Sequence, residues 1–208
     1  MTTMTLDRAG GSWLSALRFA LVGMLLFGLL LPLTMTVLNQ LLFPAQATGS
    51  LLLRDGQVVG SALVGQPFVG PGWFYGRPSA AGWDPRAAAG SNWAPSNPAL
   101  RERMAADAAA IAAREAVAPT AIPVELISAS GSGLDPHISP DAARLQIARV
   151  ARERNLPTAT LQALVDAHTA HPWLGPPVVN VLELNLALDE GTKELESKSD
   201  ALPRPFGS

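Results

Sequence analysis

The densest group of residues that could do chemistry lies in the segment 128–140, SASGSGLDPHISP. It brings together Ser130, Asp135 and His137. These are the residue types of a hydrolytic triad, in which histidine takes a proton from serine and the carboxylate orients the histidine. The segment lacks the G-x-S-x-G turn that exposes the nucleophile in many hydrolases. The residue types alone leave an exported hydrolase that uses this cluster as an alternative function.

The same segment allows two other interpretations. Its glycines precede a predicted helix start at Ser139-Pro140, an arrangement that can bind an anion, although the phosphate-binding pattern G-x-x-x-x-G-K-[ST] is absent. The other interpretation is structural: a tight glycine turn in which Asp135 and Ser139 cap main-chain N–H groups. We favour the structural interpretation.

Metal and nucleic-acid chemistry find little support in the residue types. His168 and His171 are three apart and could share a helix face, but a zinc site needs further ligands. The chain contains no cysteine, which excludes disulfides, thiol nucleophiles and cysteine-bound zinc. Its net charge of −2 argues against a basic nucleic-acid binder. We expect neither a metal site nor a nucleic-acid partner.

The elements that position these residues predict a single mixed domain of the α+β class. Asp55-Gly56 between two β-prone runs predicts a type I′ hairpin over 50–63. Asn-Pro and Ser-Pro pairs, at Asn97 and Ser139, are typical of helix starts. The expected helices are 98–117, 140–154 and 158–168, and the expected strands are 122–128 and 178–188.

Residues 65–98 have a different texture, because they hold six glycines, six prolines and three of the five tryptophans. Such a composition disfavours long regular elements, whereas the aromatic residues indicate an ordered segment. Trp73, Trp83 and Trp93 either form a docking surface or close the core of the domain itself.

The low overall charge of 15% is explained by one uncharged stretch, from Phe19 to Leu53. About 20 apolar residues span the 30 Å hydrocarbon core of a bilayer, so we predict a transmembrane helix over 19–40. Arg8 and Arg18 precede it, which by the positive-inside rule places the N-terminus in the cytoplasm and the rest of the chain outside. A cleaved signal peptide, with Ala45-Gln46-Ala47 as its cleavage site, is the alternative.

These observations give four predicted regions. Residues 1–18 form a short cytoplasmic N-terminus, and residues 19–40 form one transmembrane helix. Residues 45–190 form an extracytoplasmic accessory domain, and residues 191–208 form a polar tail that is expected to be disordered.

Two long segments then suggest a family. SASGSGLDPHISPDAARLQIARVARERN and, after it, GPPVVNVLELNLALD resemble the C subunits of bacterial Kdp potassium-transporting P-type ATPases. The single anchor, Gly65-Gln66 after the hairpin and Phe74 with Arg77-Pro78-Ser79 add to the resemblance, which runs from the anchor to Asp189.

The resemblance implies a non-catalytic accessory subunit of a high-affinity, ATP-driven potassium-uptake complex in the bacterial inner membrane. Its implied partners are a potassium-binding channel-like subunit, an ATP-hydrolysing pump subunit and a small membrane peptide. The sequence agrees in lacking the D-K-T-G phosphorylation motif of a pump subunit. The implied role is assembly and stability of the complex.

The resemblance also implies ATP as a ligand, with Gln146 as a suggested nucleotide contact and a higher ATP affinity of the pump subunit as the result. The predicted topology places Gln146 outside the cell, away from cytoplasmic ATP. The alternative is a domain that caps the outer face of the channel-like subunit. The further structural or interface candidates in the matching segments are Ser130, Gly131, Ser132, Gly133, Asp135, Arg149, Asn180 and Asn185.

Overall fold

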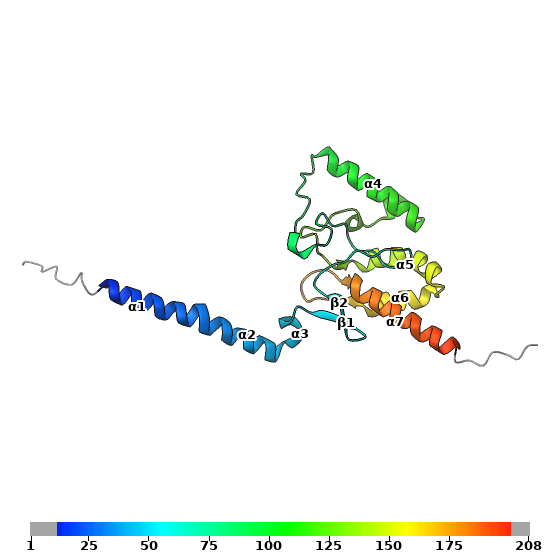
Figure 1. Cartoon of the computed structure of the whole chain (residues 1–208). Helices are drawn as coiled ribbons and strands as arrows, with labels where there is room; N and C mark the ends of the chain where they lie inside the picture. Colours follow the sequence, from blue (N-terminus) through cyan, green and yellow to red (C-terminus); the bar gives the residue numbers. More distant parts are fainter. Residues whose placement is uncertain (1–11, 201–208) are drawn as a thin grey trace, which may run out of the picture. The chain divides into compact units, whose positions relative to one another are not determined.

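The computed structural model describes the fold of residues 12–200, which divides into two units between Ser50 and Leu51. In the first unit, α1 (Ser12–Leu25), a π-helical turn (Leu26–Leu30) and α2 (Leu31–Leu42) follow one another as one helix, before the short α3 (Pro44–Ala47) (Figure 1). Within Trp13–Leu42, the most apolar window of 18 residues has a mean hydropathy of 2.3, and none of its residues is buried. It is long and apolar enough to cross a bilayer, and it contains the predicted span 19–40.

Three polar side chains of this helix form hydrogen bonds within the helix itself. The π-helical turn ends at Leu30, two residues before Pro32, whose missing N–H interrupts the regular hydrogen-bond ladder. The side chains of Thr34, Thr36 and Asn39 each donate a 2.8 Å hydrogen bond to the carbonyl four residues earlier. Such internal satisfaction is what a helix in lipid requires, because the hydrocarbon offers no partners.

The second unit begins with the predicted hairpin. β1 (Leu51–Arg54) pairs antiparallel with β2 (Gln57–Ser61). The two turn residues both have positive φ, 51° at Asp55 and 76° at Gly56, as a type I′ turn requires. The hairpin prediction is confirmed.

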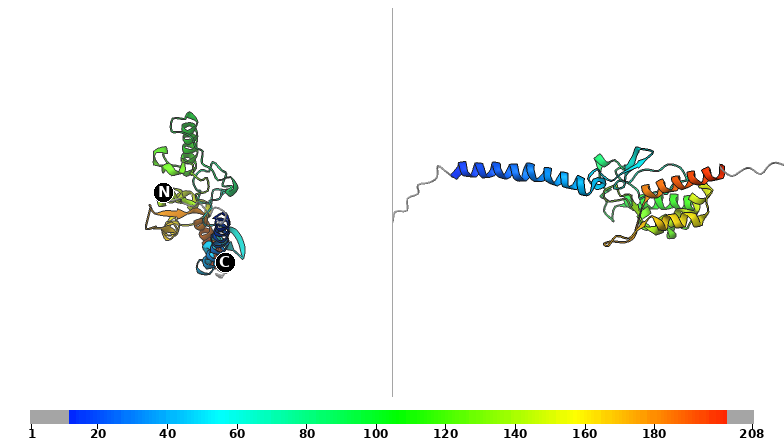
Figure 2. Two further views of the ribbon diagram at one scale, coloured as in Figure 1. Left: turned by 90° about the vertical axis from the view of Figure 1, so that its left-hand side faces the viewer. Right: turned by 90° about the horizontal axis from the view of Figure 1, so that it is seen from below.

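The rest of the second unit combines helices with a small sheet, so the predicted α+β class is confirmed. α6 contacts both α5 and α7, and these three helices lie side by side (Figures 1 and 2). α4 packs against α5. The three-stranded antiparallel sheet has the order β3-β5-β4. The elements are α4 (Pro98–Glu115), β3 (His137–Ile138), α5 (Pro140–Arg154), α6 (Thr158–Ala167), β4 (Thr169–Ala170), β5 (Val178–Asn180) and α7 (Val181–Asp200).

Helices α4 and α5 begin at the predicted caps. The Asn97 side chain accepts a hydrogen bond from the Ala99 amide (3.0 Å), and the Ser139 hydroxyl accepts one from the Ala142 amide (3.1 Å). Each pair satisfies an N–H group that the first turn of a helix leaves without a partner. Together with α6, all three predicted helices are confirmed.

The predicted strand over 122–128 is wrong. The chain there forms two 3-10 turns, Pro119–Ala121 and Val124–Leu126. Ile122 and Leu126 are buried whereas Val124 is 66% exposed, so the inward-facing residues are four apart rather than two. Pro123 also removes a donor that a strand ladder needs.

The predicted strand over 178–188 is correct only for β5, because α7 begins at Val181. The Asn180 side chain accepts hydrogen bonds from the amides of Leu182 (3.0 Å) and Glu183 (3.2 Å), and it thereby caps the helix. The buried residues then recur with helical spacing at Val181, Leu184, Asn185 and Leu188. α7 continues to Asp200 and so extends into the tail predicted to be disordered, while residues 201–208 lie outside the described residues.

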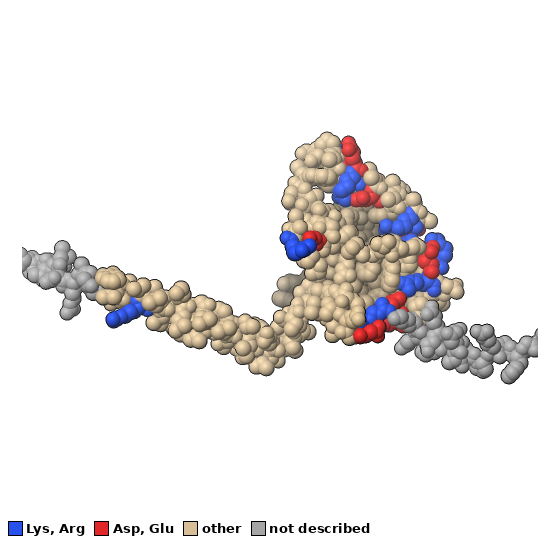
Figure 3. All heavy atoms as spheres, in the orientation of Figure 1, with Lys and Arg blue, Asp and Glu red and all other residues tan. Residues whose placement is uncertain are grey.

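The surface of this unit mixes both signs of charge. On the face seen in Figure 3, basic and acidic side chains lie next to one another along one side, without a patch of a single sign. Several charged side chains of this unit form ion pairs, such as Arg144 with Asp166 and Arg152 with Glu153.

Candidate functional site

The main chain of residues 71–79, which we call the strap, is held between α5 and α7 by side-chain amides. Asn185 of α7 accepts from the Phe74 amide (2.9 Å) and donates to the Phe74 carbonyl (2.9 Å). Gln146 of α5 does the same for the next residue, accepting from the Tyr75 amide (2.8 Å) and donating to its carbonyl (3.0 Å). Two helices thus form hydrogen bonds with consecutive residues of the strap.

Arg149 fixes the first part of the strap. Its guanidinium donates to the carbonyls of Pro71 and Trp73, and to the Gln146 side chain at 3.0 Å. The same group pairs with Glu115 of α4, with both carboxylate oxygens 3.0 Å from Nε. Both side chains are almost wholly buried, so neither charge has water as an alternative partner.

Tyr75 lies beside two arginines of this network. The guanidinium carbons of Arg114 and Arg149 lie 4.2 Å and 4.7 Å from the centre of its ring. Such cation–π contacts favour one orientation of the ring. Its hydroxyl donates a 2.6 Å hydrogen bond to the Gly70 carbonyl, which closes the turn that leads into the strap.

Arg154, at the end of α5, also contacts the strap. It donates to the Gly72 carbonyl (2.9 Å), lies 4.1 Å from the centre of the Trp73 ring and pairs with Asp189 of α7. Asp189 also pairs with Arg54 of the hairpin. Burial raises the pKa of Asp189, but the hydrogen bonds and charges of these two arginines outweigh it and leave the pKa below its ordinary value.

The segment 128–140 binds the far end of the strap. The Ser79 hydroxyl donates to the Gly133 carbonyl (2.6 Å), and the Ser130 amide donates to the Pro78 carbonyl (3.0 Å). Gly133 has a φ of +71°, and a Cβ there would lie 2.7 Å from the Ala81 side chain. The glycine is therefore needed both for the turn and for the close approach of two chain segments.

Asp135 and His137 lie close together, but Ser130 does not join them. The His137 ring lies 3.5 Å from the Asp135 carboxylate, whose other oxygen accepts from Arg77 at 2.9 Å. The His137 side chain first, then its main-chain amide and Arg77, lower the pKa of Asp135 to about 2, against a partial rise from burial. The Ser130 hydroxyl instead contacts Ser132 (3.2 Å) and the Gly133 amide (3.1 Å).

Most of the residues predicted from the sequence meet at the strap. Gln146, Arg149 and Asn185 hold its first part, and the loop of Ser130, Gly133 and Asp135 holds its last part. Gly131 and Ser132 are exposed members of that loop. Asn180 lies apart: besides capping α7, it donates a 2.7 Å hydrogen bond to the Ala62 carbonyl after the hairpin.

Sequence reasoning missed the partners of these side chains, above all Tyr75, Glu115 and Arg154. The detectable signal was Glu115, a carboxylate in an alanine-rich helix, and the structure shows its side chain wholly buried. His168 and His171 do not share a helix face, since α6 ends at Ala167 and His171 lies in an exposed loop. Among the described residues, no group of three or more histidine or acidic side chains could hold a metal ion.

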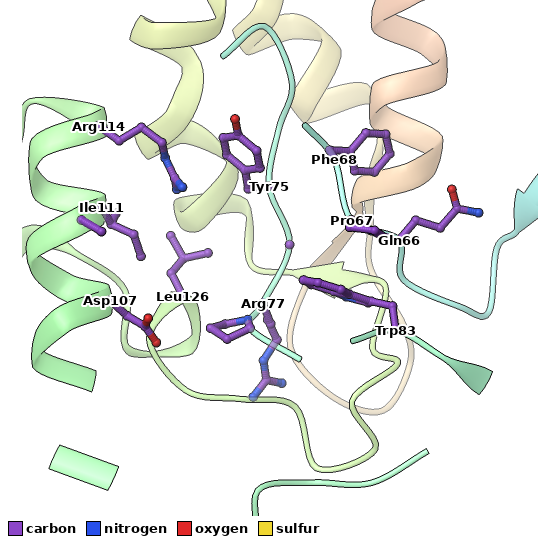
Figure 4. A pocket seen from close by; sticks show the side chains of 13 residues that line it. Gln66, Pro67, Phe68, Tyr75, Arg77, Trp83, Asp107, Ile111, Arg114 and Leu126 are labelled. Atoms are coloured by element: carbon purple, nitrogen blue, oxygen red, sulfur yellow. The ribbon is translucent and has the colours of Figure 1, made fainter. Parts of the chain in front are cut away.

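A cavity of about 370 Å³ opens between the strap and α4 (Figure 4). Its walls combine aromatic and aliphatic side chains with Arg77 and Arg114, and both arginines are already paired with carboxylates. The labelled side chains that line it are Gln66, Pro67, Phe68, Tyr75, Arg77, Trp83, Asp107, Ile111, Arg114 and Leu126. The described polar side chains around the strap therefore stabilise the fold, and they do not place a nucleophile beside a base.

The chain is similar to a family of known proteins along nearly its whole length. The family model described as K+-transporting ATPase, c chain, matches residues 13–190. A potassium-transporting ATPase KdpC subunit of Shewanella putrefaciens is 50% identical over 183 residues, which cover 86% of this chain and 92% of that protein.

Two further relatives carry the same name. The KdpC subunit of Pseudomonas putida is 52% identical over 177 residues, which cover 84% of this chain and 94% of that protein. The KdpC subunit of Xanthomonas campestris is 49% identical over 192 residues, which cover 91% of this chain and 92% of that protein. The chain, with its apolar helix and strapped α+β unit, therefore belongs to the KdpC family, the C chains of potassium-transporting ATPases.

Proposed function

We propose that this chain is the accessory subunit of a high-affinity, ATP-driven complex that imports K+ into the cytoplasm. The observation that carries the proposal is the family match over residues 13–190, which includes both the apolar helix and the following unit. Its partners in this role are a potassium-binding channel-like subunit, an ATP-hydrolysing pump subunit and a small membrane peptide. The chain contributes assembly and stability and catalyses no reaction itself.

The use of polar side chains in the second unit supports a structural role. Gln146, Arg149 and Asn185 are 0%, 2% and 1% exposed. All three form hydrogen bonds with the main chain of the strap, and Arg149 also donates to Gln146. A unit whose main chain is fixed in this way loses little conformational freedom when a partner binds, which favours association. We infer that the unit acts as a rigid body on the outer face of the complex.

The proposed location is the bacterial inner membrane, with a cytoplasmic N-terminus, one transmembrane helix and an extracytoplasmic domain. Because the chain has no cysteine, single-cysteine variants report topology without background. A membrane-impermeant maleimide added to intact cells should label Ala88→Cys, an exposed position in the second unit, and leave Thr5→Cys unlabelled. The reverse labelling pattern would contradict this orientation.

The family resemblance adds a role in ATP binding that involves Gln146. The amide of Gln146 is fully buried and bonded to Tyr75, so direct contact with a nucleotide requires the strap to leave α5. We propose that any effect of Gln146 on nucleotide affinity is transmitted through the strap. Gln146→Ala and Asn185→Ala, which release neighbouring strap residues, should then weaken ATP binding by the assembled complex to a similar degree. A loss confined to Gln146→Ala would indicate direct contact.

Growth of cells in scarce potassium tests the proposed function as a whole. Cells that express the partner subunits without a C subunit should fail to grow at low K+, and this chain should restore growth. A variant that lacks residues 51–208 should fail to do so. If cells without any C subunit grow as well as those with the chain, the proposed role is contradicted.

A further inference from the structure

The loop of residues 171–177, HPWLGPP, is exposed along its whole length. At its tip Trp173 is 92% exposed and Leu174 is 68% exposed. The loop projects from the body of its unit at the end where α7 begins (Figure 2). Two neighbouring apolar side chains on a projecting loop are unfavourable in water unless something covers them.

The loop is held firmly at its base. β4 and β5, which flank it, pair with each other in the small sheet, and β5 continues directly into α7. Three prolines restrict its main chain, and Gly175 supplies a φ of +103° that other residues adopt rarely. The tip is therefore presented by a stiff support, which lowers the entropic cost of burying it.

The chemistry of the segment fits a bilayer interface. Residues 167–182 contain no lysine, arginine, aspartate or glutamate. The Trp173 indole N–H donates to none of the described residues, so the ring presents an apolar body with a free polar edge. Tryptophan is enriched where hydrocarbon meets water, because one part of its ring is apolar and the N–H can stay wet.

The apolar helix keeps this loop close to a membrane. Only residues 43–50 separate the end of α2 at Leu42 from β1 at Leu51, a stretch that reaches about 30 Å when fully extended. A unit of this size is about 40 Å across, so its surface can turn toward the bilayer to which it is tethered. The tether also raises the effective concentration of the loop at that surface.

We propose that Trp173 and Leu174 insert into the interface of the lipid bilayer and form a second attachment of the domain beside the transmembrane helix. The proposal rests on the anchor that is part of the proposed function. The two attachments together restrict how the domain can rotate above the membrane, which pre-orients it toward partner subunits in the same bilayer.

The test uses the full chain in vesicles of phosphatidylcholine. A spin label on Leu174→Cys should collide more often with oxygen, which concentrates in lipid, and less often with a water-soluble nickel complex. The matched controls are labels on Val69→Cys and Val124→Cys, two exposed apolar positions at 87% and 66% exposure. Their labels should show the opposite preference. In a double variant that also carries Trp173→Ser, the label at position 174 should collide with oxygen and with the nickel complex as often as the control labels do.

The outcomes separate this proposal from the anchor on which it rests. Co-flotation of the chain with vesicles reports the anchor, and a chain that does not float contradicts the anchor. A chain that floats with a fully water-accessible label at position 174 overturns the lipid contact alone. If that label becomes shielded only when the other subunits are present, the loop binds protein, and the lipid proposal is overturned as well.

Discussion

Gln146 exchanges two hydrogen bonds with the main chain of Tyr75, at 2.8 Å and 3.0 Å, although 71 residues separate them. Its Oε1 also accepts from Arg149, and its Nε2 is 3.2 Å from the Ala142 carbonyl of the preceding turn. Every polar atom of this buried amide is therefore used inside the chain. The residue that the family resemblance singles out is part of the support that holds the strap on α5.

The first prediction concerns this contact. Gln146→Ala leaves the partly buried amide and carbonyl of Tyr75 without partners, so the free energy of unfolding should fall by about 2–4 kcal/mol. Gln162→Ala is the matched control, because that side chain makes one exposed hydrogen bond, to Asp166. It should change stability by about 0.5 kcal/mol or less. Urea unfolding of the full chain in detergent measures both, and equal effects would contradict the account.

A second prediction concerns the buried ion pair of Glu115 and Arg149. Glu115→Ala leaves the guanidinium of Arg149, 2% exposed, without its counter-charge, and should cost about 3–5 kcal/mol of stability. Glu153→Ala removes a carboxylate from an exposed pair with Arg152 and should cost about 0–1 kcal/mol. Thermal unfolding of the two variants side by side compares them. A small loss for Glu115→Ala would mean that the pair does not hold α4 against α5.

The two glycines of the S-G-S-G sequence should respond differently to the same substitution. A Cβ at Gly133 meets the Ala81 side chain and the Ala89 carbonyl at 2.7 Å, in a main chain with φ of +71°. Gly133→Ala should therefore cost about 2–4 kcal/mol, from strain and displaced neighbours. A Cβ at Gly131 meets nothing within 4 Å, so Gly131→Ala should be nearly neutral. Indistinguishable unfolding midpoints would exclude the close packing of this loop.

The pKa of Asp135 leads to a prediction about acid. Contacts with His137 and Arg77 lower this pKa from 3.8 to about 2, so the ionised carboxylate stabilises the fold. A lowered pKa contributes stability above the unfolded-state value, and that contribution is lost as the pH falls from about 4 to about 2. Since the group is partly exposed, we expect about 1–2 kcal/mol. Asp135→Asn should remove this part of the pH dependence, whereas parallel curves for variant and unaltered chain would contradict it.

Local signals in the sequence predicted the elements whose causes are local. The turn at Asp55-Gly56 and the caps Asn97 and Ser139 act within three residues, and all three are confirmed. The helix after β5 was missed because its apolar residues also suit a strand. Asn180 followed three residues later by Glu183 is the capping pattern that could have revealed it.

The strap could not be predicted in this way. Its contacts join residues that are far apart in the chain, such as Phe74 and Asn185, 111 residues apart. Resemblance named Gln146, Arg149 and Asn185, but only the fold shows that they share one target. Proline and glycine in residues 71–79 indicated irregular structure without indicating what holds it in place.

The central claim, that this chain is an accessory subunit of a potassium-transporting ATPase, is tested most directly by purification. An affinity-tagged chain is isolated from membranes of cells that express all the subunits, and the eluate is assayed for K+-stimulated ATP hydrolysis. We predict that the pump and channel-like subunits elute with the chain and that the eluate is active. A chain that elutes alone, with the activity left in the unbound fraction, would contradict the account.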